Sequence, residues 1–494
     1  MGAVAALCLI AAPPSAFGHG EKGEMYVPWT DKLTEQRAIK AFSGKSSNRM
    51  TAAQEPLGTS NLALVGNSDK DGVVNSDLAF WGNLAYAGNY GGFRILDITT
   101  DVPQVISDVA CNGPQNDVSV HELAGRRYLF QSIDTAQTSE GCDSANAPIV
   151  DGVGRVGYEG IRVFDVTDPA NPQFLEMIQT ACGSHTHTLI PDGDNRAYIY
   201  VSSYPLGTNI TPPGAEGPGD WKACELPHKK ISIIEVTGGS AFSWRLKEQP
   251  LSDDTAFNRG FQACHDVQVY MPTKVAIGSC AGDAQLWDVS NPWKPTTDVE
   301  GKHTHIYSPS ASDQFEFIHS GVVTWDGKYF AIMDETGGGG TANCFGSQST
   351  DGFYYFYKMV KPGKRIGKPI SRYMIPRDQG EEICVSHNAS VIPVAKRYVM
   401  SASYYQGGVT VVDFTNVSKP REIAYADLED GIGDSDEWSS YWYNGRIFSN
   451  GGLNRRDGSN RGLDVFRPAA SLGLSGAKTW WRSNPQTQEA WQAP

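Results

Sequence analysis

The sequence has no apolar run long enough to cross a membrane, so we expect no membrane span. It is also short of basic residues, with 41 Lys and Arg against 55 Asp and Glu, and its formal net charge is −14. This acidic balance argues against binding to nucleic acid or to anionic membrane surfaces. Nine cysteines occur, but none forms a Cys-x-x-Cys pair, so a zinc–thiolate site is not expected.

Turn-forming and aromatic residues, in contrast, are plentiful. The chain contains 53 Gly and 28 Pro among 494 residues, and aromatic residues make up 11%. Together with the short apolar runs, this composition favours many strands joined by turns over helices. A chain of this length can form two or three average domains or one large β architecture.

The first 18 residues are similar to a secretory signal. Residues 3–12 are apolar, and Ser15-Ala-Phe-Gly18 offers small residues for cleavage. No Lys or Arg precedes the apolar stretch, which departs from the usual signal. We predict a signal peptide over residues 1–18 and a secreted or periplasmic protein. Removal of the signal leaves eight cysteines, and this even number favours disulfides in an oxidising compartment.

One strand-like motif recurs seven times, and its clearest copies end in an acidic residue and a turn. These copies begin at Gly92, Gly160, Lys230, Asp283 and Gly408, and degenerate copies begin at Gly352 and Gly462. Repeats of about 40 or more residues, each with several short strands, indicate the blades of a propeller. The motif, for example Gly160-Ile-Arg-Val-Phe-Asp165, resembles the LVIVD-repeat family. That resemblance implies a β-propeller, often an exported one, over roughly residues 60–468.

The predicted fold is therefore all-β, a single seven-bladed β-propeller with four-stranded blades. Blade 7 lacks an obvious fourth strand, and residues 61–66, which precede blade 1, could supply it. This N-terminal strand would close the ring and hide a sheet edge. Residues 19–59 and 469–494 are polar with weak periodicity. We expect them to be N- and C-terminal extensions that lie on the propeller surface.

Four of the ten histidines occupy equivalent positions in consecutive blades. Each lies four residues before an apolar residue, as in His185-Thr-His-Thr-Leu189. Aligning all blades on this spacing gives one ring position at the start of the innermost strand: Ser76, Asn116, His185, His265, His319, His387 and Glu437. Equivalent positions of a closed repeat fold meet around one axis. The four histidines are therefore predicted to bind one metal ion.

Imidazole donors with at most one carboxylate suit a transition metal and disfavour Ca²⁺ and Mg²⁺. We expect one ion, with Fe or Cu favoured and Zn as a further candidate. Carotenoid-cleaving oxygenases are similar in one respect, since they are seven-bladed propellers with iron on four axial histidines, although no sequence motif is shared. The favoured hypothesis is an oxidase or oxygenase that acts on a small organic substrate at the channel mouth.

Two other functions stay open on the sequence alone. The chain could be a non-enzymatic binding or scaffold propeller of the periplasm or cell surface, with a structural metal. It could also be a propeller polysaccharide lyase with a His or Tyr as base. The sequence gives no oligomeric state.

Residues near the predicted channel mouth are candidates for catalysis. Glu437 could be a ligand, a general base or a partner that fixes an imidazole tautomer. Tyr204 and Tyr404 could orient a substrate. Loops at this face of the propeller are expected to bring four more polar residues towards the channel mouth, namely Asp134, Tyr158, Glu335 and Tyr405.

Further histidines could also bind metal. His187 lies two residues after His185 and could replace or supplement it. His303 and His305 are expected in the linker between blades 4 and 5, where they could hold a second ion. His19 would be the mature N-terminal residue, whose amine and imidazole could chelate copper.

The cysteines and the long loops are expected on the face where the ring histidines lie. The long loops are residues 134–157, 204–229 and 334–351. Loops on a rigid scaffold commonly shape binding sites. From the blade geometry we predict four disulfides: Cys111–Cys142, Cys182–Cys224, Cys264–Cys280 and Cys344–Cys384.

Overall fold

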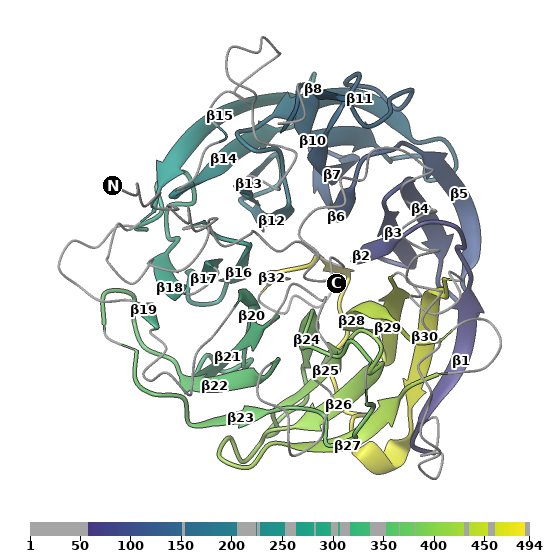
Figure 1. Ribbon diagram of the computed structural model, residues 1–494, viewed down its shortest axis with the longest axis vertical. Coiled ribbons are helices and arrows are strands. Elements are labelled where there is room, and N and C mark those ends of the chain that lie inside the picture. Colours follow the sequence, from purple (N-terminus) through teal and green to yellow (C-terminus); the bar gives the residue numbers. More distant parts are fainter. Residues whose placement is uncertain are drawn as a thin grey trace, which may run out of the picture.

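Seven four-stranded antiparallel sheets stand in a ring around a central channel (Figure 1). The computed structural model describes residues 58–150, 154–204, 224, 228–251, 263–280, 283–297, 305–306, 317–335, 352–364, 366–380, 382–428, 434–452 and 460–489. In these ranges the regular elements are β-strands and one 3₁₀ turn, Ala470–Leu472. No helix among them is long and apolar enough to span a bilayer. The predicted all-β, seven-bladed propeller is confirmed.

Each blade contributes one innermost strand to the channel wall. From channel to rim the blades are: blade 1, β2 (Asn75–Trp81), β3 (Leu84–Asn89), β4 (Gly92–Asp97) and β5 (Gln104–Ala110); blade 2, β6 (Gln115–Leu123), β7 (Arg126–Gln137), β10 (Tyr158–Asp165) and β11 (Gln173–Gln179); blade 3, β12 (Thr186–Pro191), β13 (Arg196–Ser202), β14 (Lys230–Thr237) and β15 (Ser243–Pro250); blade 4, β16 (Asp266–Tyr270), β17 (Val275–Cys280), β18 (Asp283–Asp288) and β19 (His305–Ile306); blade 5, β20 (Ile318–Val323), β21 (Tyr329–Asp334), β22 (Tyr354–Lys358) and β23 (Ser371–Tyr373); blade 6, β24 (Ala389–Ile392), β25 (Val399–Ser403), β26 (Val409–Asp413) and β27 (Arg421–Ala426); blade 7, β28 (Glu437–Tyr443), β29 (Arg446–Gly451), β30 (Gly462–Pro468) and β1 (Leu62–Ser68).

The ring is closed by the N-terminal strand, as the sequence predicts. β1 is the outermost strand of blade 7 and pairs antiparallel with β30, from Leu62 opposite Pro468 to Ser68 opposite Leu463. The first and last strands of the propeller therefore share one sheet. This pairing covers the edge of β30 that would otherwise be open.

The acidic end of the repeated motif has a structural role at the turn that leaves the third strand. In four blades the carboxylate accepts a hydrogen bond from the backbone N–H two residues later, which is an Asx turn. The pairs are Asp97 with Thr99, Asp165 with Thr167, Asp288 with Ser290 and Asp413 with Thr415, at 2.7–2.9 Å. The recurrence of Asp followed by Thr or Ser thus reflects the geometry of the fold.

Apolar side chains fill the space between neighbouring blades. Ile161 and Val163 of β10 pack in one buried cluster with Leu189 of β12 and Ile199 of β13. Burying a side chain of this size contributes about 1.5–3 kcal/mol. Equivalent clusters between the other blades hold the ring rigid around the channel.

Three of the four predicted disulfides are confirmed. Bonds join Cys111 to Cys142, Cys182 to Cys224 and Cys264 to Cys280. Cys384 is also disulfide-bonded, and its predicted partner Cys344 lies outside the described residues. Disulfides of this kind are typical of proteins that fold in an oxidising compartment.

Residues 480–489 of the predicted C-terminal extension lie in the channel, and not on the outer surface as expected. The C-terminal tail, residues 480–489, contains two short strands, β31 (Arg482–Ser483) and β32 (Thr487–Gln488). β31 pairs with the innermost strand of blade 1 and β32 with that of blade 4 (Figure 1). Both contacts are at the end of these strands that is remote from the ring position. The tail therefore occupies the channel end opposite the histidines.

The tail reaches the same position in five consecutive blades. In each blade it contacts the backbone of the residue four positions after the ring position. The contacts, with the tail residue named first, are Ser483 to Phe80, Asn484 to Val120, Thr487 to Leu189, Gln486 and Thr487 to Val269, and Gln488 to Val323. Innermost strands expose backbone groups towards the channel. The tail satisfies these groups with its own backbone and with side-chain amides.

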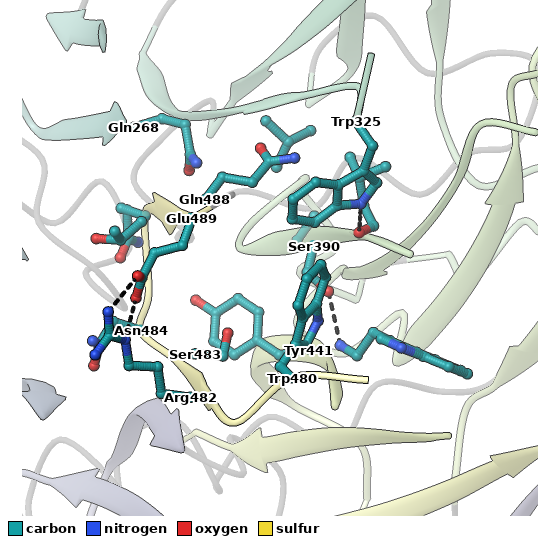
Figure 2. Close-up of a pocket in the computed structure, with 16 residues that line it drawn as sticks. Gln268, Trp325, Ser390, Tyr441, Trp480, Arg482, Ser483, Asn484, Gln488 and Glu489 are labelled. Carbon is teal, nitrogen blue, oxygen red and sulfur yellow. Dashed lines mark hydrogen bonds and ion pairs between the residues drawn. The ribbon is translucent and has the colours of Figure 1, made fainter. Parts of the chain in front are cut away.

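A pocket lies beside the tail at blades 5 to 7. Trp325, Tyr441 and Trp480 line it together with Gln488 and Glu489 (Figure 2). Here the indole N–H of Trp325 donates to the carbonyl of Val391. Val391 is the equivalent residue of blade 6, so in this blade a tryptophan makes the hydrogen bond that the tail makes elsewhere.

Removing two tail amides is expected to destabilise the propeller. Asn484 bonds both backbone groups of Val120 (2.7 and 2.9 Å), and Gln488 bonds both backbone groups of Val323 (3.3 and 2.7 Å). A buried backbone group without a partner costs about 1–3 kcal/mol. We expect the double variant Asn484→Ala/Gln488→Ala to melt at a clearly lower temperature in calorimetry. Gln173→Ala, on the exposed outer strand β11, is the control, and equal melting of both variants would contradict the role of the tail.

Candidate metal centre

The fold brings the four predicted histidines to the start of four adjacent innermost strands. The backbone N–H groups of His185, His265 and His387 donate to the carbonyls of Ser202, Ser279 and Ser403, at 3.1, 2.7 and 3.1 Å. Each acceptor lies near the end of the second strand of the same blade. This shared backbone pattern places the imidazoles at the same height along the propeller axis. The spacing of the repeats predicts this arrangement.

The four imidazoles form a continuous buried arc. Ring centroids are 4.5 Å apart for His185 and His265, 4.1 Å for His265 and His319, and 4.2 Å for His319 and His387. Each residue is at most 1% exposed. The Nε2 atoms of His185 and His265 are 2.9 Å apart. Two imidazole nitrogens this close either share one proton or direct two lone pairs at one ion.

Partners outside the arc hold its two end imidazoles. Nδ1 of His185 lies 2.8 Å from a carboxylate oxygen of Asp134, and Nδ1 of His387 donates to the backbone carbonyl of Trp438. With Nδ1 protonated in this way, Nε2 carries the lone pair and faces the other imidazoles. Metal-binding histidines are commonly oriented by such carboxylate and carbonyl acceptors.

The carboxylate of the cluster comes from Glu335, which directly follows β21 in blade 5. Its two oxygens lie 3.8 Å from Nε2 of His319 and 3.6 Å from Nε2 of His387. The hydroxyl of Tyr405 donates to the same carboxylate. In the described ranges, His265, His319 and Glu335 are the one group of three metal-binding side chains whose ligand atoms lie within 4.8 Å of one another.

Aromatic side chains surround the imidazoles. The ring of Tyr204 is 5.2 Å from that of His185, and the ring of Phe317 is 5.2 Å from that of His265. Tyr405 and Trp438 lie 4.6 and 5.2 Å from His387. These apolar surfaces exclude water and lower the local dielectric, which strengthens the interaction of the nitrogen and oxygen donors with a cation.

The side chains of two other predicted catalytic residues have partners outside the imidazole arc. The carboxyl of Glu437 accepts a hydrogen bond from Ser449 in blade 7. Burial, together with the negative charge of Asp464, raises its pKa to about 8. Tyr404 packs against Tyr354 of β22, at 5.5 Å between ring centroids. Their catalytic roles stay predictions, whereas Tyr204 does lie beside two imidazoles.

The remaining histidines are in other surroundings. His187 is hydrogen-bonded at both ring nitrogens, by Ser119 (2.7 Å) and Ser132 (2.8 Å) of blade 2, and burial lowers its pKa to about 3. It therefore packs against blade 2 and does not join the arc. His305 begins β19, the outer strand of blade 4, and so is not in a linker. His303 and His19 lie outside the described residues.

Three of the polar residues expected near the channel mouth lie beside the imidazoles. They are Asp134, Glu335 and Tyr405. Tyr405 lies at a turn with φ of 45°, where Gly408 N–H donates to its carbonyl. That turn directs its ring to His387, while the preceding residue faces the core. Glu335 directly follows the second strand of blade 5, so an alignment of the first strands does not include it. Its place at the start of a long loop is the reason that it was expected near the channel mouth.

No family model matches the chain, and no curated protein matches it. Among solved structures, Sqt1 of Chaetomium thermophilum, crystallised with the N-terminus of ribosomal protein L10, is similar over 83% of this chain and 92% of its own. The identity is 12% and the TM-score 0.43. Sqt1 of Saccharomyces cerevisiae is similar over 82% of this chain and 98% of its own, with 8% identity and a TM-score of 0.44. Function is therefore argued from the residues of this chain.

Proposed function

We propose that the chain is an exported propeller metalloprotein whose transition metal is bound by His185, His265, His319 and His387. The observation that carries this proposal is the contact of four buried imidazoles along one arc, with the Glu335 carboxylate close to His265, His319 and His387. Four neutral nitrogen donors and one carboxylate form a ligand set for Fe or Cu, with Zn as a further candidate. Such a convergence of donors is costly to maintain without a cation to bind.

The surrounding residues support this assignment through the roles they can play. Asp134 and the carbonyl of Trp438 fix the orientation of the outer imidazoles. Tyr405 orients the Glu335 carboxylate, which lies next to two Nε2 atoms. Glu335 can act as a fifth ligand, or it can accept a proton from a substrate at the centre.

We further propose that the protein is an oxidase or oxygenase that acts on a small organic substrate. A bound Fe or Cu ion would supply the activation of O₂, which is the oxidant. The substrate would enter from the histidine face, because the tail occupies the other end of the channel. Tyr204 and Phe317 pack against His185 and His265 and would offer an apolar surface to a substrate bound there.

The first test is elemental analysis of the purified protein together with paramagnetic resonance and absorption spectra. We expect about one Fe or Cu per chain, with the spectrum of a nitrogen-rich site. Oxygen uptake should then depend on the metal during a screen of small organic compounds. Full metal content without metal-dependent turnover would instead assign the ion a structural role in a binding propeller.

Replacing Glu335 by Gln is expected to weaken metal binding about 10- to 100-fold, as is typical when a carboxylate close to a metal is lost. The amide keeps the shape of the side chain and can still accept the Tyr405 hydrogen bond, but it carries no charge. Competition with a chromophoric chelator measures the change in affinity. Glu437→Gln is the matched control, because its carboxyl pairs with Ser449. An equal loss in both variants would remove Glu335 from the proposed centre.

A further inference from the structure

The pocket beside the tail lies at the end of the channel opposite the histidine centre. It contains about 580 Å³ of free space, part of which is open to solvent, between the tail and residues of blades 4 to 7. One of its walls is aromatic. The ring centroids of Trp325 and Trp480 are 4.7 Å apart with their planes tilted by 36°, and Tyr441 adds a third ring. Aromatic walls combined with a few polar groups are typical of small-molecule sites.

The wall opposite the two indoles is polar (Figure 2). Arg482 and Glu489 of the tail meet there through two hydrogen bonds, from Nε and a terminal nitrogen of the guanidinium to the two carboxylate oxygens, at 2.8 and 2.7 Å. They are the charged residues among those that line the pocket, and their charges cancel. A molecule bound in the pocket therefore meets both donors and acceptors but no net charge.

Gln268 supplies a polar group that the fold itself does not use. It lies on β16 of blade 4, and its amide points into the pocket (Figure 2). The residue is only 6% exposed, and its side chain has no hydrogen bond to any of the described residues. An amide carries both donors and an acceptor, and enclosing it without partners is unfavourable. The Gln268 amide is therefore free to bind a molecule in the pocket.

We propose that this pocket binds a neutral hexopyranose, a sugar ring without charged groups. One face of a pyranose presents polarised C–H groups, which pack on the electron-rich faces of indole rings. Its hydroxyls each donate and accept hydrogen bonds. Gln268 can do both, and the Arg482 guanidinium has donors beyond the two that Glu489 accepts. Because the charges of this pair cancel, the pocket favours neither a cation nor an anion.

The test uses the full chain and three probes, the methyl pyranosides of glucose, galactose and mannose. We expect titration calorimetry and saturation-transfer NMR to show that at least one of them binds, at about one site per chain. Choline, a cation, and benzoate, an apolar anion, should not displace the bound glycoside. The proposal would be overturned if none of the three glycosides binds, or if choline or benzoate displaces them.

Two variants test the two walls of the pocket. Gln268→Leu keeps the size of the side chain but removes its hydrogen bonds, so it should weaken glycoside binding about 10-fold. Its melting temperature should not fall, because the amide has no partner in the fold. Trp480→Ala should abolish measurable binding, whereas Trp244→Ala, which removes a 40% exposed indole from the rim of blade 3, should preserve it. A Gln268→Leu protein with wild-type affinity would contradict the proposal, even if Trp480→Ala fails to fold.

The sugar site is independent of the proposed metal centre, because it lies at the other end of the channel and uses other residues. His265→Ala/His319→Ala should therefore keep its affinity for the glycoside, and Gln268→Leu should keep its Fe or Cu. A protein without metal that still binds the glycoside would refute the metal centre alone. Loss of glycoside binding in a folded His265→Ala/His319→Ala variant would place the sugar at the histidines and overturn the present proposal.

Discussion

The double variant His265→Ala/His319→Ala is expected to retain less than about a tenth of the bound metal. These two residues form the middle of the imidazole arc, and their ligand atoms lie within 4.8 Å of Glu335. Their loss leaves His185 and His387 at opposite ends of the arc, with two donors in place of four. Metal affinity falls steeply when two of the four imidazole donors are removed, because fewer ligands then act together on the ion. Elemental analysis and the loss of the metal spectrum measure the result.

The control for this variant is His187→Ala. His187 is as deeply buried and lies two residues from His185, but its ring nitrogens are hydrogen-bonded to Ser119 and Ser132. We expect it to lower stability while leaving the metal content unchanged. Added imidazole should partly restore metal to the double variant by occupying the vacated positions, which a purely structural defect would not allow. Full metal content in the double variant would refute the histidine centre.

The histidine arc could be predicted because its residues occupy equivalent positions in repeated blades. The ring position begins each innermost strand, and its hydrogen bond to the second strand is repeated in blades 3, 4 and 6. A spacing of four residues to a buried apolar residue was therefore enough to align the blades. The closing strand β1 and three disulfides follow from the same reasoning, since both depend on the order of strands within a blade.

Other parts of the site depend on local turns and on distant contacts. Tyr404 and Tyr405 were both expected near the channel mouth, but only their places in a turn decide that the ring of Tyr405 meets His387. The position of the tail was not predicted, for another reason. Asn484 and Gln488 bind the backbone of Val120 and Val323, and such contacts require no pattern in the partner sequence. Polar residues with weak periodicity gave no sign of them.

Glu437 is expected to make the protein less stable as pH rises from about 5 to 8. In the unfolded chain its carboxyl ionises near the ordinary value of 4.5, whereas burial raises its pKa in the fold to about 8. Between these values the unfolded state loses the proton that the folded state keeps, so ionisation favours unfolding. Each pH unit in this window costs about 1.4 kcal/mol, which amounts to a few kcal/mol in total. Below pH 4.5 both states are protonated and the penalty disappears.

Glu437→Gln should remove this dependence, because the amide is neutral at every pH and resembles the protonated acid. We expect the variant and the wild-type protein to have similar melting temperatures near pH 5, and the variant to be clearly more stable at pH 8. Glu140→Gln, an exposed change, controls for the general effect of removing a charge. Parallel melting curves for Glu437→Gln and wild type across this range would show that the carboxyl is ionised in the fold. A charged Glu437 would then need a cationic partner, and its assignment to blade 7 packing, apart from the metal centre, would have to be abandoned.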